Sequence, residues 1–526
     1  MSDRPNRPLG RAIAKASAIL LASVLGALLL SAAGASGLSP GVEAPRSPAP
    51  PTPTSSRSTS PAFPGRDIKA PLPAVAAKTA RALVDGVGLP ELSIDDLGPR
   101  VLVVAPHPDD ETIAAGGLIR SLVTARRKVS VVIDTCGDGF AIGAAACLGP
   151  RGYTPTGLRK YGAMRAAESL AAAKALGLRP GDVTFLGFPD GGGASEMSTQ
   201  WNDGDPHRGR NGTRACPYPF ALDPGGAYSG AQYARELEQV LERTDPTTVV
   251  YPDMNDLNSE HWSTGAFVQY ALMASDRHPI ELTYVVHRDD YPRPLAFKPS
   301  DQLLPPYELT STGAQWHAFV LTSAQTRVVR SAIDSYRTQS VVGNEGSFLQ
   351  AFDRANEVFA TYRTPVMSRQ AEPPVMSAGA DLPFAVILHP ANSVPIRRLR
   401  AYGGIARVAM ARDKDSFVLG LQLRAPLKPS VTYAFDLRVR TAAGVLRYRV
   451  GVGDDGARGT VRGDDGADTA VAVRGPMPVG RTTDRVWVTL PVSVLAGATQ
   501  ALLEAETWWH GKLIDRAGYQ RIAIAR

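Results

Sequence analysis

The sequence predicts an α/β domain built on a mostly parallel sheet with helices on both faces, followed by an all-β sandwich domain. Between residues 100 and 252, short apolar runs alternate with segments of helical periodicity, which is typical of a parallel sheet. From about Ala371 the apolar residues recur with a period of two, which is typical of antiparallel strands. The length of 526 residues allows each domain its own core.

Residues 1–35 are expected to be a signal peptide. Four basic residues precede an uncharged, mostly apolar stretch, and Ala33-Gly34-Ala35 supplies the small residues of a cleavage site. The alternative is an uncleaved N-terminal anchor, because the stretch is almost long enough to span a bilayer; residues 12–35 would then be a membrane tether. Either interpretation places the protein outside the cytoplasm, secreted or in the cell envelope. Residues 36–74, rich in Pro, Ser and Thr, are predicted to be an extended linker.

The distribution of charge argues against a nucleic-acid partner. The formal net charge is +7, but residues 1–64 hold six basic and two acidic residues and so carry +4 of it. The rest of the chain carries only +3, whereas a nucleic-acid-binding body is expected to present a strongly basic surface.

The elements of the α/β domain, predicted over residues 75–370, alternate along the chain. Each expected strand is an apolar run, and the expected helix Tyr161–Leu178 has the usual glycine stop, Gly177, at its end. A long inserted loop is expected at Gly191–Gly230, and a helical stretch at Thr322–Tyr362 closes the domain. The strands are expected at Arg100–Pro106, Lys128–Thr135, Val183–Phe188 and Thr248–Pro252, and the helices at Glu111–Arg127, Tyr161–Leu178 and Gln232–Arg243.

Residues 371–526 are predicted to form the β-sandwich, with one face of each strand in water. On this interpretation four arginines lie on a solvated sheet face: Arg438, Arg440, Arg447 and Arg449. The Trp508-Trp509 pair suits stacking on sugar rings, so the domain is a candidate carbohydrate-binding module. The alternative is that these rings belong to the core, because alternation along a strand turns only one of them outward.

The three cysteines are compatible with an oxidising compartment and one disulfide. Three pairings are possible, among which Cys147 and Cys216 are favoured because both lie in expected loops. Cys136 ends an expected strand and is predicted to be a buried thiol.

The residues that carry chemistry follow the first strand. His107 and the pair Asp109-Asp110 leave a buried strand at its carboxyl end, where α/β folds place ligands. Imidazole and carboxylate groups are both zinc ligands, and His107 and Asp110 can turn inward together while Asp109 stays nearby and unligated. The alternative is a helix start, with Asp109 as N-cap and His107 merely packed. A histidine at the strand end favours the metal site.

A third protein ligand is expected, because catalytic zinc sites usually have three and one open position. His261 follows the strand Thr248–Pro252 and begins a helix. It therefore lies at an equivalent end of the same sheet and is the best placed of the eight histidines.

The motif Pro106-His107-Pro108-Asp109-Asp110-Glu111 resembles the signature of the PIG-L/LmbE-type zinc-dependent N-acetylglucosamine de-N-acetylases. The resemblance spans roughly Arg100–Tyr362 and includes Met164–Glu168 and Phe185–Gly191. It implies a Rossmann-like sheet. It also implies that His107, Asp110 and His261 bind Zn²⁺, or another divalent first-row metal, and that Asp109 is the general base.

The resemblance assigns further residues to the substrate. Arg165 and Asp190 match positions that contact sugar in relatives. Asn258 stands where the family usually has a histidine, three residues before the third ligand, so it can donate a hydrogen bond to an oxyanion but carries no charge. His287 either supplies a compensating imidazole or is structural.

The expected function is therefore exported, metal-dependent hydrolysis of the N-acetyl group of an N-acetylglucosamine-type sugar in a glycan or glycoconjugate. Two alternatives stay open. One is a non-catalytic glycan-binding protein with a degenerate metal site. The other is an amidase that acts on another N-acyl glycoconjugate.

Overall fold

The computed structural model describes residues 88–289, 291–306, 309, 312–342, 345–367, 386–388, 400–453, 456–463, 471–472 and 479–525. The expected signal peptide and linker lie outside these residues. Pro71–Arg526 form one compact unit, and the predicted division of this unit at residue 370 falls outside the described residues and stays a prediction. None of the helices among the described residues is long and apolar enough to cross a membrane.

The first part of the described chain is a seven-stranded sheet in the order β3-β2-β1-β4-β5-β7-β6. The strands from β3 to β5 are parallel neighbours, and β7 and β6 add an antiparallel edge. The strands are β1 (Arg100–Ala105), β2 (Lys128–Thr135), β3 (Val183–Phe188), β4 (Thr248–Pro252), β5 (Ile280–Tyr284), β6 (Gln315–Val320) and β7 (Asn356–Thr361).

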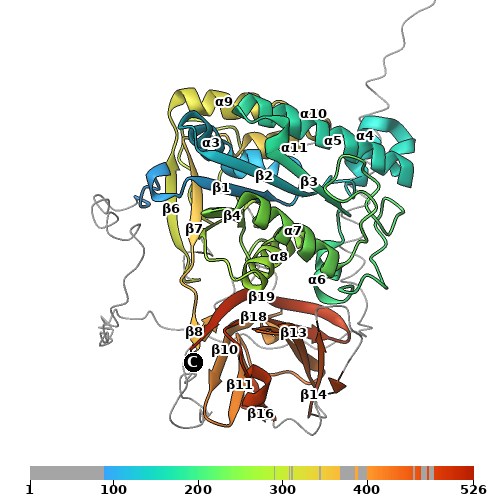
Figure 1. Cartoon of the computed structure of the whole chain (residues 1–526), viewed down its shortest axis with the longest axis vertical. Helices are drawn as coiled ribbons and strands as arrows, with labels where there is room; N and C mark the ends of the chain where they lie inside the picture. Colours follow the sequence, from blue (N-terminus) through green and yellow to red (C-terminus); the bar gives the residue numbers. More distant parts are fainter. Residues whose placement is uncertain are drawn as a thin grey trace, which may run out of the picture. The chain divides into compact units, whose positions relative to one another are not determined.

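Helices cover both faces of this sheet, which confirms the predicted α/β class (Figure 1). Helices α3, α5 and α9 lie on one face, and α7 and α8 lie on the other. The helices are α3 (Asp110–Thr124), α4 (Ala141–Leu148), α5 (Pro155–Leu176), α6 (Gly193–Ser198), α7 (Gly230–Thr244), α8 (Ser259–Ala274), α9 (Ser323–Ile333), α10 (Arg337–Ser340) and α11 (Glu345–Gln350).

The expected helical stretch Thr322–Tyr362 is wrong at its end. Helices α9, α10 and α11 occupy its first part, but Asn356–Thr361 is the strand β7. All but the last residue of β7 are buried between β5 and β6. The polar residues of this strand (Asn356, Glu357 and Thr361) do not alternate with its apolar ones, so no period of two distinguishes it from the helical stretch before it.

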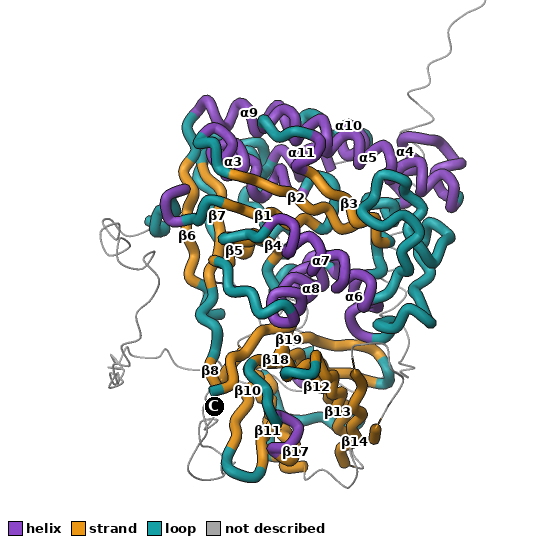
Figure 2. Tube along the Cα trace, in the orientation of Figure 1, coloured by secondary structure: helices purple, strands orange, loops and turns teal. Residues whose placement is uncertain are grey.

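The C-terminal part contains two further sheets, mostly antiparallel (Figure 2). Their order is β16-β17-β11-β10-β9 in one and β15-β14-β13-β12-β18-β19-β8 in the other. Side chains from both sheets share one hydrophobic cluster, which includes Phe417 and Leu419 from one sheet and Phe435 and Leu437 from the other. The strands are β8 (Val366–Met367), β9 (Val386–Leu388), β10 (Ile405–Arg412), β11 (Ser416–Leu423), β12 (Val431–Thr441), β13 (Gly444–Gly453), β14 (Gly456–Gly463), β15 (Val471–Ala472), β16 (Val479–Arg481), β17 (Arg485–Pro491), β18 (Gln500–Trp509) and β19 (Lys512–Ile524).

The expectation of a solvated arginine face on this second sheet is wrong for two of the four residues. Arg438 is fully buried and Arg447 is 9% exposed. The face opposite the hydrophobic cluster packs against helices of the first part of the chain, as the hydrogen bond from the Gln269 side chain on α8 to the Tyr519 carbonyl on β19 illustrates. Period-two alternation identifies the two faces of a strand but not what covers each of them.

The expected disulfide is absent, because all three cysteines are free thiols in the structure. Cys136 is buried, as predicted. Cys216 is also buried, with its thiol directed at the Leu186 carbonyl, whereas the thiol of Cys147 is directed at the Thr338 carbonyl.

Candidate active site

The candidate site lies where the strand order of the parallel sheet reverses. Strands β1 and β4 are neighbours, but the chain leaves β1 toward β2 on one side and leaves β4 toward β5 on the other. A crevice forms outside the carboxyl ends of two such strands, because their connections diverge. His107 follows β1, and His261 lies in the first turn of α8, shortly after β4.

Three predicted ligands converge in this crevice. Asp110 Oδ2 lies 3.1 Å from His107 Nδ1 and 3.2 Å from His261 Nε2. One ligand atom from each residue lies within 4.8 Å of those of the other two, and all three residues are buried. The structure therefore brings together residues that stand up to 154 positions apart in the sequence.

The group fits a divalent metal ion. Neither ring nitrogen of His261 makes a hydrogen bond to another described residue, although the side chain is fully buried. Buried polar atoms are normally satisfied, and the groups nearest to these nitrogens are the Asp110 and Asp256 carboxylates, at 3.2 and 3.3 Å. An imidazole beside a carboxylate and a second imidazole is the donor set expected of a metal site. Two histidines and one carboxylate with an open position suit zinc.

The Asp256 carboxylate lies beside the second ring nitrogen of His261. Its Oδ2 lies 3.3 Å from His261 Nδ1 and accepts hydrogen bonds from the backbone N–H groups of Val286 and His287 at 2.9 and 3.0 Å. Burial alone would raise the pKa of Asp256, but His261 and these hydrogen bonds hold it below the usual value. A carboxylate at the second nitrogen of a metal-binding histidine fixes the orientation of its ring. Asp256 was not among the residues predicted from sequence, although it lies five residues before His261.

Asp109 occupies the N-cap position of α3 but does not act as a cap. Its side chain makes no capping hydrogen bond, and its backbone has a φ of 134°, a strained conformation for a residue other than glycine. Instead Oδ2 accepts a hydrogen bond from Arg165 Nη2 at 3.0 Å. Burial raises the pKa of Asp109 to about 7, although Arg165 opposes the rise. The alternative in which Asp109 is merely a cap therefore does not describe this residue.

Arg165 and Asp190, two of the three predicted substrate-binding residues, line the cavity at this site. Arg165 Nη2 also donates to the Pro108 carbonyl at 2.9 Å and so holds the loop between β1 and α3. Asp190 Oδ1 lies 3.4 Å from His107 Nε2, and its Oδ2 accepts a hydrogen bond from the backbone N–H of Gly139 at 3.0 Å.

Asn258 is the N-cap of α8. Its Oδ1 accepts a hydrogen bond from the backbone N–H of Glu260 at 2.9 Å, which is the expected cap interaction. Because Oδ1 is committed to the cap, the amide nitrogen is the group that Asn258 offers to the cavity it lines. The residue therefore has a structural role that its place in the motif did not reveal.

His287 also lines the cavity and packs between two other rings. Its ring stacks on Phe348 at 5.3 Å between centroids and meets His261 edge-on at 4.7 Å. Burial, together with the neighbouring His261, lowers the pKa of His287 to about 4. A neutral imidazole at this position can donate or accept a hydrogen bond but carries no charge.

The cavity has a volume of about 290 Å³. Its wall combines the polar residues above with apolar side chains, among them Phe140, Phe348 and Leu349. Arg210 and Gln339 also line it. Sequence reasoning did not identify Arg210 because it lies in the inserted loop, where no periodicity assigns a direction to a side chain.

Comparison with known proteins gives three results. Residues 102–272 match the family model for PIG-L, the GlcNAc-PI de-N-acetylases. The 1D-myo-inositol 2-acetamido-2-deoxy-alpha-D-glucopyranoside deacetylase of Actinosynnema mirum is 34% identical over 155 residues, which are 30% of this chain and 47% of the relative. The enzyme of the same name from Mycolicibacterium smegmatis is 36% identical over 113 residues, which are 21% of this chain and 35% of the relative. The chain thus spans less than half the length of these curated relatives.

Solved structures with partial similarity include two deacetylases. A deacetylase of the teicoplanin biosynthesis pathway has a TM-score of 0.33 and 16% identity, covering 50% of this chain and 96% of that one. N,N'-diacetylchitobiose deacetylase from Pyrococcus horikoshii has a TM-score of 0.28 and 16% identity, covering 45% of this chain and 70% of that one.

Proposed function

We propose that this chain, whose residues 102–272 match the PIG-L family model, is a metal-dependent de-N-acetylase that acts on N-acetylglucosamine-type sugars. The observation that carries the proposal is the convergence of His107, Asp110 and His261 beside a cavity that His107, Asp110 and the carboxylate of Asp109 line. The metal we propose is Zn²⁺, and the substrate is a glycan or glycoconjugate.

In this proposal Asp109 moves the proton. A divalent metal, when bound, supplies Lewis-acid chemistry that polarises an amide carbonyl and acidifies water. Asp109 lines the cavity and accepts the proton of the attacking water, then returns it to the leaving sugar amine. A carboxyl whose pKa is about 7 suits both steps near neutral pH, because a general base works best with a pKa close to the working pH.

Three neighbours assist this step. Arg165 holds the Asp109 carboxylate in place through the hydrogen bond between them. The amide nitrogen of Asn258 donates to the oxygen on which negative charge develops, the role that a histidine fills in the family pattern. Asp190 accepts hydrogen bonds from sugar hydroxyl groups at the cavity wall.

The test is acetate release from N-acetylated sugars by the full chain loaded with Zn²⁺. The panel contains chito-oligosaccharides, N-acetylglucosaminyl glycoconjugates and N-acyl compounds without a sugar, each measured before and after removal of the metal. Metal-dependent acetate release from the sugars alone is the expected result. Binding of the sugars without acetate release would instead favour a non-catalytic glycan-binding protein. Release from the compounds without a sugar would favour a different amidase.

We also propose that the protein is exported by residues 1–35 and works outside the cytoplasm. The support is the basic segment, the apolar stretch and the Ala33-Gly34-Ala35 site in the sequence. Cell fractionation combined with N-terminal sequencing of the mature protein tests this. A mature chain that begins at Ser36 is expected, whereas an intact Met1 in a membrane fraction would indicate an anchor.

A further inference from the structure

A buried arginine of the C-terminal sheet reaches helix α6 near the candidate active site. Arg438 on β12 is fully buried, and its Nη2 donates a hydrogen bond to the Met197 carbonyl at 2.6 Å. Its guanidinium carbon lies 3.8 Å from the ring centroid of Trp201 and 5.3 Å from that of Tyr270. A cation removed from water needs such partners, because burial without them is costly.

A second arginine acts beside it. Arg447 stands directly opposite Arg438 in the β12–β13 pairing, and it donates to the Ser198 carbonyl and to Asp436 Oδ2. Two like charges opposite one another destabilise a sheet, so this pair requires compensation. Asp436 supplies one negative charge, and the carbonyls at the end of α6 supply the negative end of a helix.

The segment 190–198, which ends with α6, begins in the candidate active site. Asp190 lines the cavity and contacts His107. The backbone N–H groups of Gly191 and Gly193 donate to Glu260 Oε1 at 2.9 and 3.3 Å. The segment 190–198 is therefore held by α8 at its start and by the two arginines of the C-terminal sheet at its end.

We propose that Arg438 and Arg447 are positioning residues for substrate binding, and that the C-terminal sheet is thereby part of the active-site architecture. They hold the segment 190–198 so that Asp190 faces the cavity. The three proposed metal ligands come from the β1–α3 loop, α3 and α8, so none of them lies in the segment that the arginines hold. The effect on substrate affinity rests on the proposed function, whereas the effect on the segment does not.

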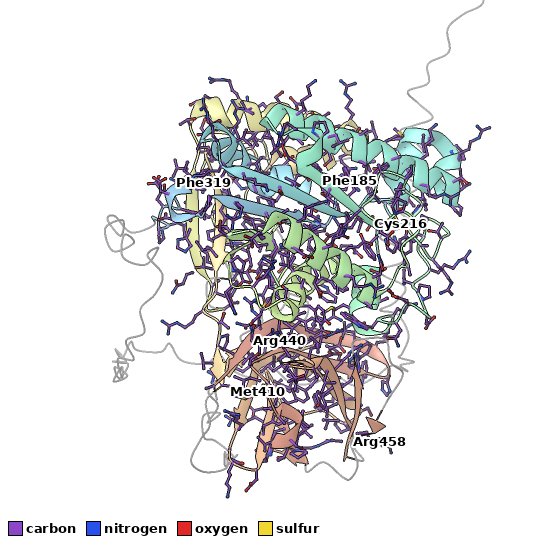
Figure 3. All side chains as sticks on the ribbon, in the orientation of Figure 1. Phe185, Cys216, Phe319, Met410, Arg440 and Arg458 are labelled. Carbon is purple, nitrogen blue, oxygen red and sulfur yellow. The ribbon has the colours of Figure 1, made fainter. Side chains whose placement is uncertain are left out.

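The chain offers a matched control on the same strand. Arg440, labelled in Figure 3, stands two residues after Arg438 and also approaches a helix end. Its Nε donates to the Ala274 carbonyl of α8 at 3.4 Å. An Arg440→Met variant therefore removes a guanidinium from the same face of β12 without removing a bond to α6.

Hydrogen exchange of the backbone amides in residues 190–198 measures the positioning directly. In Arg438→Met and Arg447→Met, exchange of this segment is expected to quicken about tenfold or more, since its local opening becomes easier. In Arg440→Met it is expected to match the original chain. Arg438→Lys keeps the charge but has one donating nitrogen instead of three, so its exchange rate is expected to lie between those of the original chain and Arg438→Met. Unchanged exchange in both methionine variants and in the lysine variant would overturn the proposal, as would equal acceleration in Arg440→Met.

Kinetics supply the second measurement. KM for the sugar is expected to rise about tenfold in Arg438→Met, while kcat and the bound metal stay near the original values and Arg438→Lys recovers part of the loss. A fall in kcat with unchanged KM, or loss of metal, would contradict a positioning role. If the exchange result is as expected but the original chain releases no acetate from any sugar, the proposed function fails and the positioning of the segment stands.

Discussion

The Asp256 carboxylate lies 3.3 Å from Nδ1 of His261, while Asp110 lies 3.2 Å from the other ring nitrogen, Nε2. His261 is thus held between two carboxylates, of which one belongs to the proposed ligand set and the other fixes the orientation of the ring. The two carboxylates therefore have different roles in the proposed site. Asp110 would bind the metal beside Nε2, whereas Asp256, at Nδ1, orients the ring so that Nε2 is the nitrogen that faces the metal.

Asp256→Asn is expected to weaken metal binding by about 10- to 100-fold, because a neutral amide holds the ring less firmly and makes it a poorer ligand. Competition with a chelator of known affinity measures the change. Asp253→Asn is the matched control, because Asp253 is also buried in this segment but contacts Thr283 and Tyr362. Equal metal affinity in Asp256→Asn and the original chain would contradict the role given to Asp256.

Asp109→Asn is expected to keep the metal and to lower kcat by about 10²- to 10⁴-fold, because the amide cannot accept the proton. His261→Ala is expected to lose the metal, since it removes one of three proposed ligands. Metal analysis and acetate release on the same preparations separate the two effects. Full activity in Asp109→Asn would rule out this residue as the base.

Two substitutions of Asn258 separate its cap from its proposed hydrogen bond to the substrate. Asn258→Asp preserves a cap acceptor but no longer donates from an amide, so kcat is expected to fall while the melting temperature is kept. Asn258→Ala removes both functions and is expected to destabilise α8 by about 1 kcal/mol as well. If Asn258→Asp retains full activity and Asn258→Ala loses only stability, the residue is a cap alone.

The buried Asp436 predicts a loss of stability in acid. Burial would raise its pKa, but Arg447 and Arg438 hold it below the usual value. The resulting stabilisation is present above the pKa of an unfolded aspartate, about 3.9, and is lost as pH falls through the lower pKa of the folded state.

Asp436→Asn is therefore expected to lower the melting temperature at pH 7, on the order of 5–10 °C, because it leaves buried arginines without their anion. Thermal unfolding of both proteins between pH 7 and pH 2 checks this. The difference between them is expected to shrink as pH falls below about 4. A difference that is constant across this range would show that the Asp436 charge contributes nothing to stability.

Local sequence patterns were sufficient to predict many of the elements in the α/β part of the chain. The predicted bounds of Lys128–Thr135, Val183–Phe188 and Thr248–Pro252 agree with β2, β3 and β4, because buried parallel strands are continuous apolar runs. The meeting of His107 with His261 also followed from sequence, since parallel strands present their carboxyl ends at one edge of the sheet.

The sequence by itself determined the order of these strands and helices along the chain. It also determined that a histidine and two carboxylates follow β1, and that a second histidine follows β4. Only the tertiary structure decided what covers each surface. Arg438 alternates with apolar residues as an exposed side chain would, yet it is fully buried against α6, and Cys147 and Cys216 stay apart. Periodicity is a property of neighbours along one strand, whereas burial and pairing depend on which distant element packs against it.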